Sequence, residues 1–299
     1  MHPDEQVATI EQVTRLVADQ LPQWAGLPVR AVDEFGTDHM LYRLGDDLVA
    51  RMPRARWAVE QVERDARWLP QLAPHLPVDV PAPLAVGTPG HGFPWPWSVV
   101  PWLPGQPPAA HDDGVQGLGV DLAAFVTSLH AIDPAGGPVK QVGTRGAPVR
   151  DWDDPVRESL QAARDVIAAR VDPGAVEAVW DDMLAAPDWQ RAPVWIHGDL
   201  MPGNMLVSGN RLSAVIDFGG LGLGDPAADL VPYWLVLGPR ERRAFRDRLD
   251  HDEATWRRAR GWAIGPAITG IPYYLESVPA FAERGLRTLE IVLDDLGSR

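Results

Sequence analysis

Residues 197–204 read His-Gly-Asp-Leu-Met-Pro-Gly-Asn and residues 217–219 read Asp-Phe-Gly, with a predicted β-hairpin between them. The strands of this hairpin are the apolar segments 205–207 and 212–216, and its turn is Ser208-Gly209-Asn210. Glycine and asparagine are residues that tight hairpin turns favour. Because a hairpin returns the chain close to its starting point, we expect the two motifs to meet at one site.

These motifs contain the oxygen-bearing side chains that phosphoryl transfer requires. The reaction needs a carboxylate that orients the attacking hydroxyl and accepts its proton, and oxygen ligands that hold magnesium against the phosphates. We expect Asp199 to be the base and Asn204 and Asp217 to be the metal ligands. His197 is interpreted as a structural residue that hydrogen-bonds the backbone. Either motif alone is compatible with an ordinary turn, and their order around a hairpin favours chemistry.

Residues 194–233 resemble the aminoglycoside phosphotransferase family, which includes the macrolide kinases and shares the protein-kinase fold. His-Gly-Asp, in place of the His-Arg-Asp of protein kinases, is typical of these antibiotic kinases. So is Gly-Asp-Pro-Ala-Ala-Asp-Leu at residues 224–230. Asp225 before Pro226 also has the pattern of a helix N-cap, so we interpret Asp225 and Asp229 as structural residues.

The resemblance and the hydrophobic pattern predict an α+β, protein-kinase-like fold with two lobes. Residues 1–101 are expected to form a small N-terminal α/β lobe that binds the nucleotide. Residues 102–299 are expected to form a larger, mostly helical lobe with the catalytic loop, the metal loop and the acceptor site. The expected strands are 29–35, 40–44, 48–52, 97–100, 194–196, 205–207 and 212–216. The expected helices are 5–21, 57–72, 118–132, 155–170, 174–186, 227–237, 240–249 and the part from 256 onward.

The first lobe contains a loop and a cation at the positions where the family binds its nucleotide. Loop 35–39, with Gly36, occupies the position of the nucleotide-covering turn. Arg51 stands where related kinases usually have lysine, and a guanidinium can pair with two phosphate oxygens at once. We expect its acidic partner to be Asp65, with Glu63 as the alternative. An ordinary turn at Gly36 and a surface position for Arg51 are the structural alternatives.

Val100 and Trp102 lie in the segment 99–103, which the resemblance matches to the hinge between the lobes. In the family this hinge binds the purine through backbone groups. Because backbone contacts do not depend on which side chains are present, the sequence does not distinguish ATP from GTP.

Two clusters in the second lobe combine carboxylates with aromatic residues. One is Asp151-Trp152-Asp153-Asp154 with Glu158, and the other contains Tyr273, Tyr274 and Glu276. Such groups suit a polyamine sugar, whose ammonium groups pair with carboxylates and whose ring faces stack on flat side chains. The structural alternatives are a helix cap at Asp153 or Asp154 and core packing of Tyr274.

The composition restricts the partners and the location. The chain has 299 residues, a formal net charge of −14 and no cysteine. Non-specific binding to nucleic acid needs a positive surface, so we expect no nucleic-acid partner. The sequence has no apolar run of membrane-spanning length and no secretory signal pattern at its start, and we therefore expect no membrane partner and a cytoplasmic location.

These features predict an enzyme that uses Mg²⁺ to transfer the γ-phosphate of ATP or GTP to a hydroxyl of a small molecule. The first candidate acceptor is an antibiotic, either an aminoglycoside or a macrolide. The alternatives are a metabolic kinase for an amino alcohol, sugar or choline-like acceptor, and a nucleotide-binding regulator without transfer activity. A protein kinase is disfavoured because only four residues separate Gly219 from Gly224, too few for a peptide-binding activation segment. The oligomeric state is not predicted.

Overall fold

The computed structural model describes residues 5–32 and 38–297 of the chain. The chain divides into two compact units, Met1–Gln106 with Ser213–Gly219 and Pro107–Leu212 with Gly220–Arg299. The first unit contains a sheet and two long helices, and the second is mostly helical, as expected. Within the described ranges, every helix is too short or too polar to cross a lipid bilayer.

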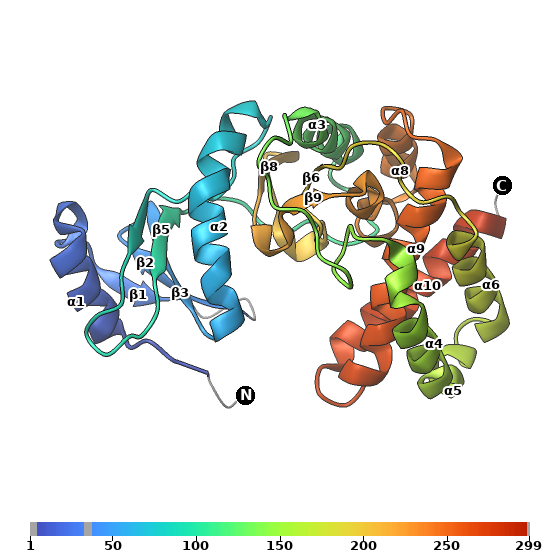
Figure 1. Ribbon diagram of the computed structural model, residues 1–299, viewed down its shortest axis with the longest axis horizontal. Helices are drawn as coiled ribbons and strands as arrows, with labels where there is room; N and C mark the ends of the chain where they lie inside the picture. Colours follow the sequence, from blue (N-terminus) through green and yellow to red (C-terminus); the bar gives the residue numbers. More distant parts are fainter. Residues whose placement is uncertain (1–4, 33–37, 298–299) are drawn as a thin grey trace. The chain divides into compact units, whose positions relative to one another are not determined.

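The first unit is built on one antiparallel sheet of five strands in the order β1-β2-β3-β5-β4 (Figure 1). The strands are β1 (Val29–Ala31), β2 (His39–Leu44), β3 (Leu48–Pro53), β4 (Ala85–Gly87) and β5 (Trp97–Pro101). The predictions for β2, β3 and β5 are confirmed. The expected strand 29–35 is present only as β1, which ends at Ala31, and residues 33–35 lie outside the described ranges. Strand β4 was not predicted from the sequence, because its residues Ala-Val-Gly show neither alternation nor a run of β-branched and aromatic residues.

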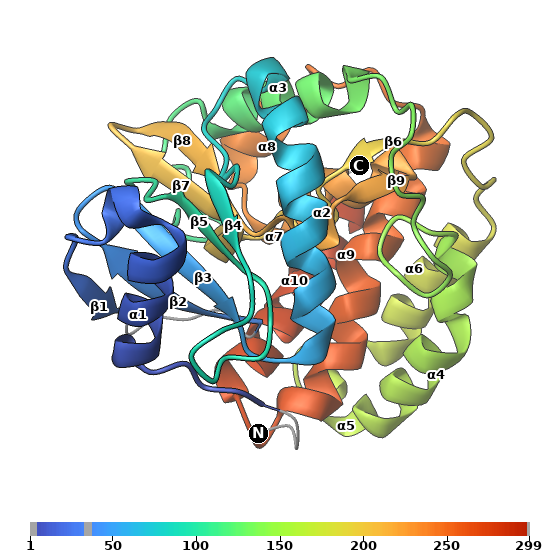
Figure 2. The same cartoon turned by 60° about the vertical axis from the view of Figure 1, so that its left-hand side comes forward.

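Alternation along β3 decides which residues face each of the two helices. Ala50 and Met52 belong to the buried cluster that includes the apolar side of α1 (Ile10–Gln20). Arg51 points to the opposite face of the sheet, because successive side chains of a strand alternate. There it meets Asp65 of α2 (Arg56–Leu72). The two helices therefore cover opposite faces of the sheet (Figure 2).

The second unit consists mainly of helices and contains a two-stranded sheet of β6 and β9. Its elements are α3 (Leu118–Ala131), α4 (Asp153–Ala162), α5 (Arg164–Ala168), α6 (Pro173–Leu184), β6 (Val194–Ile196), β9 (Gly222–Gly224), α7 (Pro232–Leu235), α8 (Pro239–Arg246), α9 (Glu253–Tyr274) and α10 (Pro279–Gly297). The two longest helices, α9 and α10, lie side by side in both ribbon views (Figures 1 and 2).

The hairpin that the sequence predicts is present as β7 (Met205–Ser208) and β8 (Arg211–Val215). Its turn residues Gly209 and Asn210 have φ angles of 55° and 63°. These left-handed values are the ones that a two-residue hairpin turn needs.

Three helix predictions are wrong in their extent. The expected helix 5–21 begins only at Ile10, because the Thr9 side chain caps it there. The expected helix 155–170 is divided into α4 and α5 at Ala163, whose φ of −99° and ψ of 10° leave helical geometry. The expected helix 227–237 is a 3₁₀ segment, Pro226–Leu230, followed by the single turn α7. Pro232 accounts for this interruption, because proline has no N–H to continue the helical hydrogen bonds.

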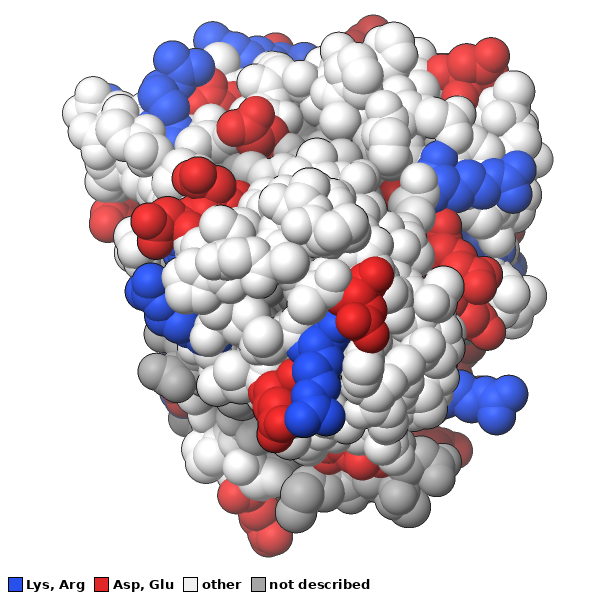
Figure 3. All heavy atoms as spheres, turned by 90° about the vertical axis from the view of Figure 1, so that its left-hand side faces the viewer, with Lys and Arg blue, Asp and Glu red and all other residues white. Residues whose placement is uncertain are grey.

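Charged side chains on the face shown in Figure 3 are mixed in sign. Lys and Arg groups stand mostly singly there, many of them next to Asp or Glu, and the described part of this face shows no continuous positive surface. Pairs on or beside α1 include Arg15 with Glu11 and His91 with Asp19. Exposed pairs of this kind contribute little to stability, so their main effect is on surface charge.

Helices α3 and α8 approach each other closely at Gly119. A Cβ atom at Gly119 would lie 2.1 Å from the backbone oxygen of Glu241, so a larger residue cannot fit without separating the helices. The Glu241 carboxylate also accepts hydrogen bonds from the N–H groups of Gly117, at 3.1 Å, and Gly119, at 2.9 Å. It thereby satisfies two of the N–H groups that the first turn of α3 leaves without helical partners.

We expect Gly119→Ala and Gly270→Ala to have opposite effects on stability, although both glycines lie in helices. Alanine favours a helix by up to about 1 kcal/mol over glycine. At Gly270 the nearest side-chain atom to a Cβ would be Cδ2 of Tyr274, at 3.7 Å, which is an ordinary contact distance, so this gain is realised. At Gly119 the clash with Glu241 should reverse it and lower the free energy of unfolding by about 2 kcal/mol or more. Chemical denaturation of both variants tests this, and equal effects would contradict the close approach.

Candidate active site

The loop after β6 holds Asp199 and Asn204 against each other. The Asn204 Nδ2 group donates to the backbone oxygen of Asp199 at 2.8 Å and to its Oδ2 at 3.0 Å. The Met201 N–H donates to the same backbone oxygen at 3.0 Å, and the Asn204 N–H donates to the oxygen of Met201 at 2.9 Å. The structure therefore brings the expected base and one expected metal ligand together, five residues apart in the chain.

A buried carboxylate fixes the start of this loop. Asp229 is completely buried and accepts hydrogen bonds from the N–H groups of His197, at 2.8 Å, and Gly198, at 2.7 Å. His130 Nε2 lies 3.3 Å from the same carboxylate. Burial alone would raise the pKa of Asp229, but the contacts with His130, His197 and Gly198 outweigh it and hold this pKa below its ordinary value. Asp229 is therefore a negative charge at neutral pH.

Gly198 and His197 complete the bend that leads to Asp199. Gly198 has a φ of 79°, and a Cβ there would lie 2.9 Å from the oxygen of Gly220, so glycine is required. His197 is completely buried, and its Nδ1 accepts a hydrogen bond from the Asp199 N–H at 3.2 Å. The structural role expected for His197 is confirmed.

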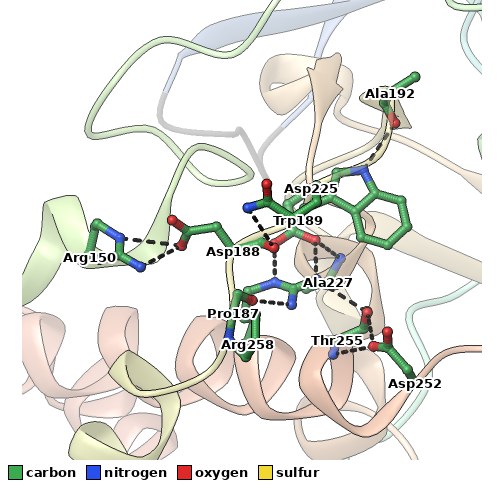
Figure 4. A network of polar contacts seen from close by, with 11 residues as sticks. Arg150, Pro187, Asp188, Trp189, Ala192, Asp225, Ala227, Asp252, Thr255 and Arg258 are labelled. Atoms are coloured by element: carbon green, nitrogen blue, oxygen red, sulfur yellow. Dashed lines mark hydrogen bonds and ion pairs between the residues drawn. The ribbon is translucent and has the colours of Figure 1, made fainter.

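Asp225 forms a second buried support for the same region (Figure 4). Its carboxylate caps the 3₁₀ segment by accepting from the Ala227 N–H at 3.0 Å, which confirms the expected cap. The Arg258 guanidinium donates to both Asp225 oxygens, at 2.6 and 3.2 Å, and to the backbone oxygen of Pro187 at 2.7 Å. Bidentate arginine pairs of this kind fix geometry as well as charge.

In the first unit, Arg51 pairs with Asp65. Arg51 Nη1 lies 3.1 Å from Asp65 Oδ2 and both side chains are largely buried, whereas Glu63 is exposed. The structure thus selects Asp65 from the two partners considered. Burial lowers the pKa of the neighbouring His39 to about 2, and the charges of Arg51 and Arg64 contribute to the shift. His39 is therefore neutral, and the positive charge here comes from the two arginines.

The Asp-Phe-Gly segment is held in the first unit by Arg64, a residue that the sequence analysis missed. Arg64 Nη2 donates to the backbone oxygens of Phe218, at 3.3 Å, and Gly219, at 2.7 Å. Asp217 has a φ of 60°, a strained value for a residue other than glycine, and its Oδ1 accepts from the Gly219 N–H at 3.3 Å. Asp217 thus lies in one compact unit, while Asp199 and Asn204 lie in the other.

The two residues expected at the hinge, Val100 and Trp102, make contacts within the first unit. Val100 is paired with Val49 of β3, and the Trp102 N–H donates to the backbone oxygen of Asp47 at 2.7 Å. The Trp102 ring also has the Arg43 guanidinium 4.0 Å from its centroid. A purine contact from Trp102 would therefore use its backbone oxygen. Gly36 lies outside the described residues.

The acceptor candidates on α4 differ in their surroundings. Asp153 accepts a hydrogen bond from Trp180 Nε1 at 2.8 Å and pairs with Arg157 at 2.8 Å, while Asp154 and Glu158 are exposed. The helix-cap alternative is wrong for both aspartates, because α4 begins at Asp153 and has no side-chain cap.

The acceptor candidates at the end of α9 lie outside the core. Tyr274 stacks on Phe281, with centroids 5.1 Å apart, and meets the edge of the exposed Tyr273. Glu276 is exposed in the segment between α9 and α10. The core-packing alternative for Tyr274 is therefore not favoured.

Arg145 is a second residue that the sequence analysis missed. Its guanidinium forms an ion pair with Asp199 Oδ1. It lies 54 residues before Asp199 in a segment without helix or strand, so no motif or periodicity connects the two.

We expect Asp229→Asn to lower the free energy of unfolding by about 3 kcal/mol, because an amide cannot accept from both N–H groups as a carboxylate does. Asp188→Asn is the matched control, since Asp188 pairs with Arg150 at the surface and should cost less than about 1 kcal/mol. Denaturation followed by tryptophan fluorescence measures both. Similar, small losses for the two variants would contradict the role given to Asp229.

Comparisons with known proteins identify the family and the fold of this chain. The chain matches the model of the Phosphotransferase enzyme family over residues 32–262, and no curated protein sequence matches it. It is similar to the solved GDP complex of aminoglycoside 2'-phosphotransferase-IIIa, with 20% identity and a TM-score of 0.71 over 97% of this chain and 100% of that one. It is also similar to macrolide 2'-phosphotransferase MphH from Brachybacterium faecium, with 24% identity and a TM-score of 0.62 over 94% and 97% of the two chains. A third similar structure is the streptomycin–ATP complex of APH(2")-IIa, with 16% identity and a TM-score of 0.58 over 95% of this chain and 97% of that one.

At these identities the solved structures establish a shared fold, and they confirm the expected kinase-like architecture. The family model covers most of the chain, including residues 197–204 and 217–219. The chain belongs to the Phosphotransferase enzyme family.

Proposed function

We propose that this protein transfers the γ-phosphate of ATP or GTP to a hydroxyl group of a small molecule, with Mg²⁺ as the metal. The contact between Asp199 and Asn204 carries the proposal, because it places a candidate base beside a candidate metal ligand. The solved relatives support the choice of ligands. One is a complex with GDP, and another is a complex with ATP and streptomycin.

Asp199 is the proposed catalytic base. Asn204 holds one carboxylate oxygen through its amide nitrogen, and backbone bonds fix the loop on either side. An ionised carboxylate held in this way can orient the acceptor hydroxyl and take its proton as the oxygen attacks phosphorus. The bond from the acceptor oxygen to phosphorus forms while the bond from phosphorus to the bridging oxygen of the nucleoside diphosphate breaks.

Asn204 and Asp217 have the donor chemistry that Mg²⁺ prefers. Since the two Asn204 bonds to Asp199 use the amide nitrogen, they leave the side-chain oxygen available as a hard ligand. Among the described residues no group of three or more His, Cys, Asp or Glu side chains converges on one point. Mg²⁺ is commonly held by one or two protein oxygens together with phosphate oxygens. When bound, Mg²⁺ would neutralise charge on the phosphates.

The nucleotide side of the proposal rests on residues 1–101. Arg51, oriented by Asp65, would pair with phosphate oxygens. Gly36 would lie in the loop that covers the phosphates, and Val100 and Trp102 would contact the purine through their backbones.

The acceptor side of the proposal rests on residues 102–299, and its first candidate is an aminoglycoside or a macrolide. Asp154, Glu158 and Glu276 would pair with ammonium groups, Tyr274 would stack on a ring, and Asp153 would hold Arg157 in place. A metabolic acceptor with an amino alcohol, sugar or choline-like hydroxyl remains the second candidate, since the same catalytic loop serves both.

We expect mass spectrometry to detect the gain of one phosphate on a member of an acceptor panel incubated with the protein, Mg²⁺ and ATP or GTP. The panel contains aminoglycosides, macrolides and hydroxyl-bearing metabolites. Asp199→Asn should reduce the rate by about 10³-fold, because loss of a positioned base typically costs 10² to 10⁴.

Asp19→Asn is the control, because Asp19 is an exposed residue of α1. Phosphorylation that survives in Asp199→Asn at the wild-type rate would contradict the assignment of the base. Binding of Mg²⁺-nucleotide without transfer to any acceptor would favour a regulator instead.

A further inference from the structure

A segment of irregular chain, residues 138–147, is fixed along β9 and is called the strap below. The Leu223 N–H donates to the oxygen of Pro138 at 2.7 Å, and the Lys140 N–H donates to the oxygen of Leu223 at 2.9 Å. Lys140 Nζ donates to the oxygen of Gly220 at 2.8 Å. These bonds attach the first part of the strap to the segment that contains β9.

The strap is fixed again directly after Arg145. The Asp225 N–H donates to the oxygen of Gly146 at 2.9 Å. Gly146 has a φ of 88°, and a Cβ there would lie 2.1 Å from Ile196 Cδ1, so the backbone is packed tightly against β6. Because backbone contacts and Lys140 hold the strap on both sides, the Arg145 side chain is not needed to anchor it.

The Arg145 side chain instead reaches the proposed base. Its Nη1 forms an ion pair with Asp199 Oδ1, while Asn204 donates to the other carboxylate oxygen, Oδ2. Each oxygen of the carboxylate thus has its own partner, one of them a full positive charge. The loop itself provides no cation, because residues 197–204 contain neither lysine nor arginine.

The position of Asp199 limits how far Arg145 lies from the reacting atoms. A hydroxyl that gives its proton to Asp199 lies about 3 Å from a carboxylate oxygen, and phosphorus lies about 3 to 3.5 Å beyond that hydroxyl. A guanidinium in contact with the same carboxylate can therefore reach the phosphoryl oxygens by a change of its side-chain rotamer.

Transfer also changes the charge that Arg145 faces. As the acceptor oxygen bonds to phosphorus and the bridging bond breaks, the hydroxyl proton moves to Asp199 and the carboxylate becomes neutral. In the transition state the charge of the phosphoryl group is spread over its three equatorial oxygens, and a cation in contact with Asp199 can pair with one of them.

We propose that Arg145 is a catalytic cation of this reaction, held by Asp199 before transfer and bound to an oxygen of the transferring phosphoryl group in the transition state. The proposal rests on the function proposed above. It assigns to the strap a role distinct from the one proposed for Arg51, which is oriented by Asp65 to pair with phosphate oxygens of the nucleotide.

The test compares the affinity for Mg²⁺-ADP with the affinity for Mg²⁺-ADP plus aluminium fluoride, an analogue of the phosphoryl group in transfer, by titration calorimetry. In the wild type we expect aluminium fluoride to tighten binding. In Arg145→Gln this tightening should fall by about 100-fold, because a fixed donor to the transition state is lost, while the affinity for Mg²⁺-ADP alone should stay within about twofold. Arg145→Lys should keep part of the effect, since it keeps the charge and loses the fork of donors.

Arg150→Gln is the matched control, because Arg150 follows the strap and pairs with exposed Asp188. Thermal melting of each variant verifies that it folds. The role of Arg145 is contradicted if aluminium fluoride raises the affinity of Arg145→Gln for Mg²⁺-ADP as much as it does that of the wild type. It is also contradicted if aluminium fluoride leaves the affinity of the wild type for Mg²⁺-ADP unchanged. If the wild type does not bind Mg²⁺-ADP at all, the proposed function falls with it.

Discussion

The completely buried carboxylate of Asp229 accepts the backbone N–H groups of His197 and Gly198, and the geometry of the catalytic loop depends on this contact. A buried negative charge is costly unless hydrogen bonds and nearby positive groups compensate it. Here two N–H groups and His130 do so and lower the pKa of the carboxylate. The direction in which the chain leaves β6 is thereby fixed, and with it the position of Asp199.

The segment that provides Asp229 also organises its neighbours. Asp225 binds Arg258 through both oxygens, and its N–H holds the strap at Gly146. One short stretch thus connects the catalytic loop, helix α9 and the segment that carries Arg145. The two aspartates of this stretch therefore hold the backbone and side chains around residues 197–204 in place.

The parts of the site that the sequence predicts are those set by local chemistry. The spacing of Asp199 and Asn204, the turn at Gly209 and Asn210, and the cap at Asp225 each depend on residues close in the chain. Arg145 and Arg64 could not be predicted in this way, because each acts on a backbone or carboxylate more than 50 residues away. The partner of Arg51 remained open between Asp65 and Glu63 until the packing of α2 against β3 decided it.

Helices and strands likewise differ in how well the sequence predicts them. Helices with a continuous apolar face, such as α1, α2 and α3, are predictable from periodicity. Strands β4 and β9 were not predicted, because their sequences, Ala-Val-Gly and Gly-Leu-Gly, lack the residues and the alternation that indicate a strand. The division of the expected helix 155–170 at Ala163 likewise has no breaker residue to indicate it.

The central proposal is that Asn204 and Asp217 hold one metal ion beside the nucleotide. Anomalous diffraction from crystals grown with Mn²⁺ and ADP or GDP measures this directly, since Mn²⁺ takes the oxygen ligands that Mg²⁺ does. We expect a manganese peak within bonding distance of the Asn204 side-chain oxygen and the Asp217 carboxylate, next to the diphosphate. A bound nucleotide whose manganese contacts neither residue would contradict the account.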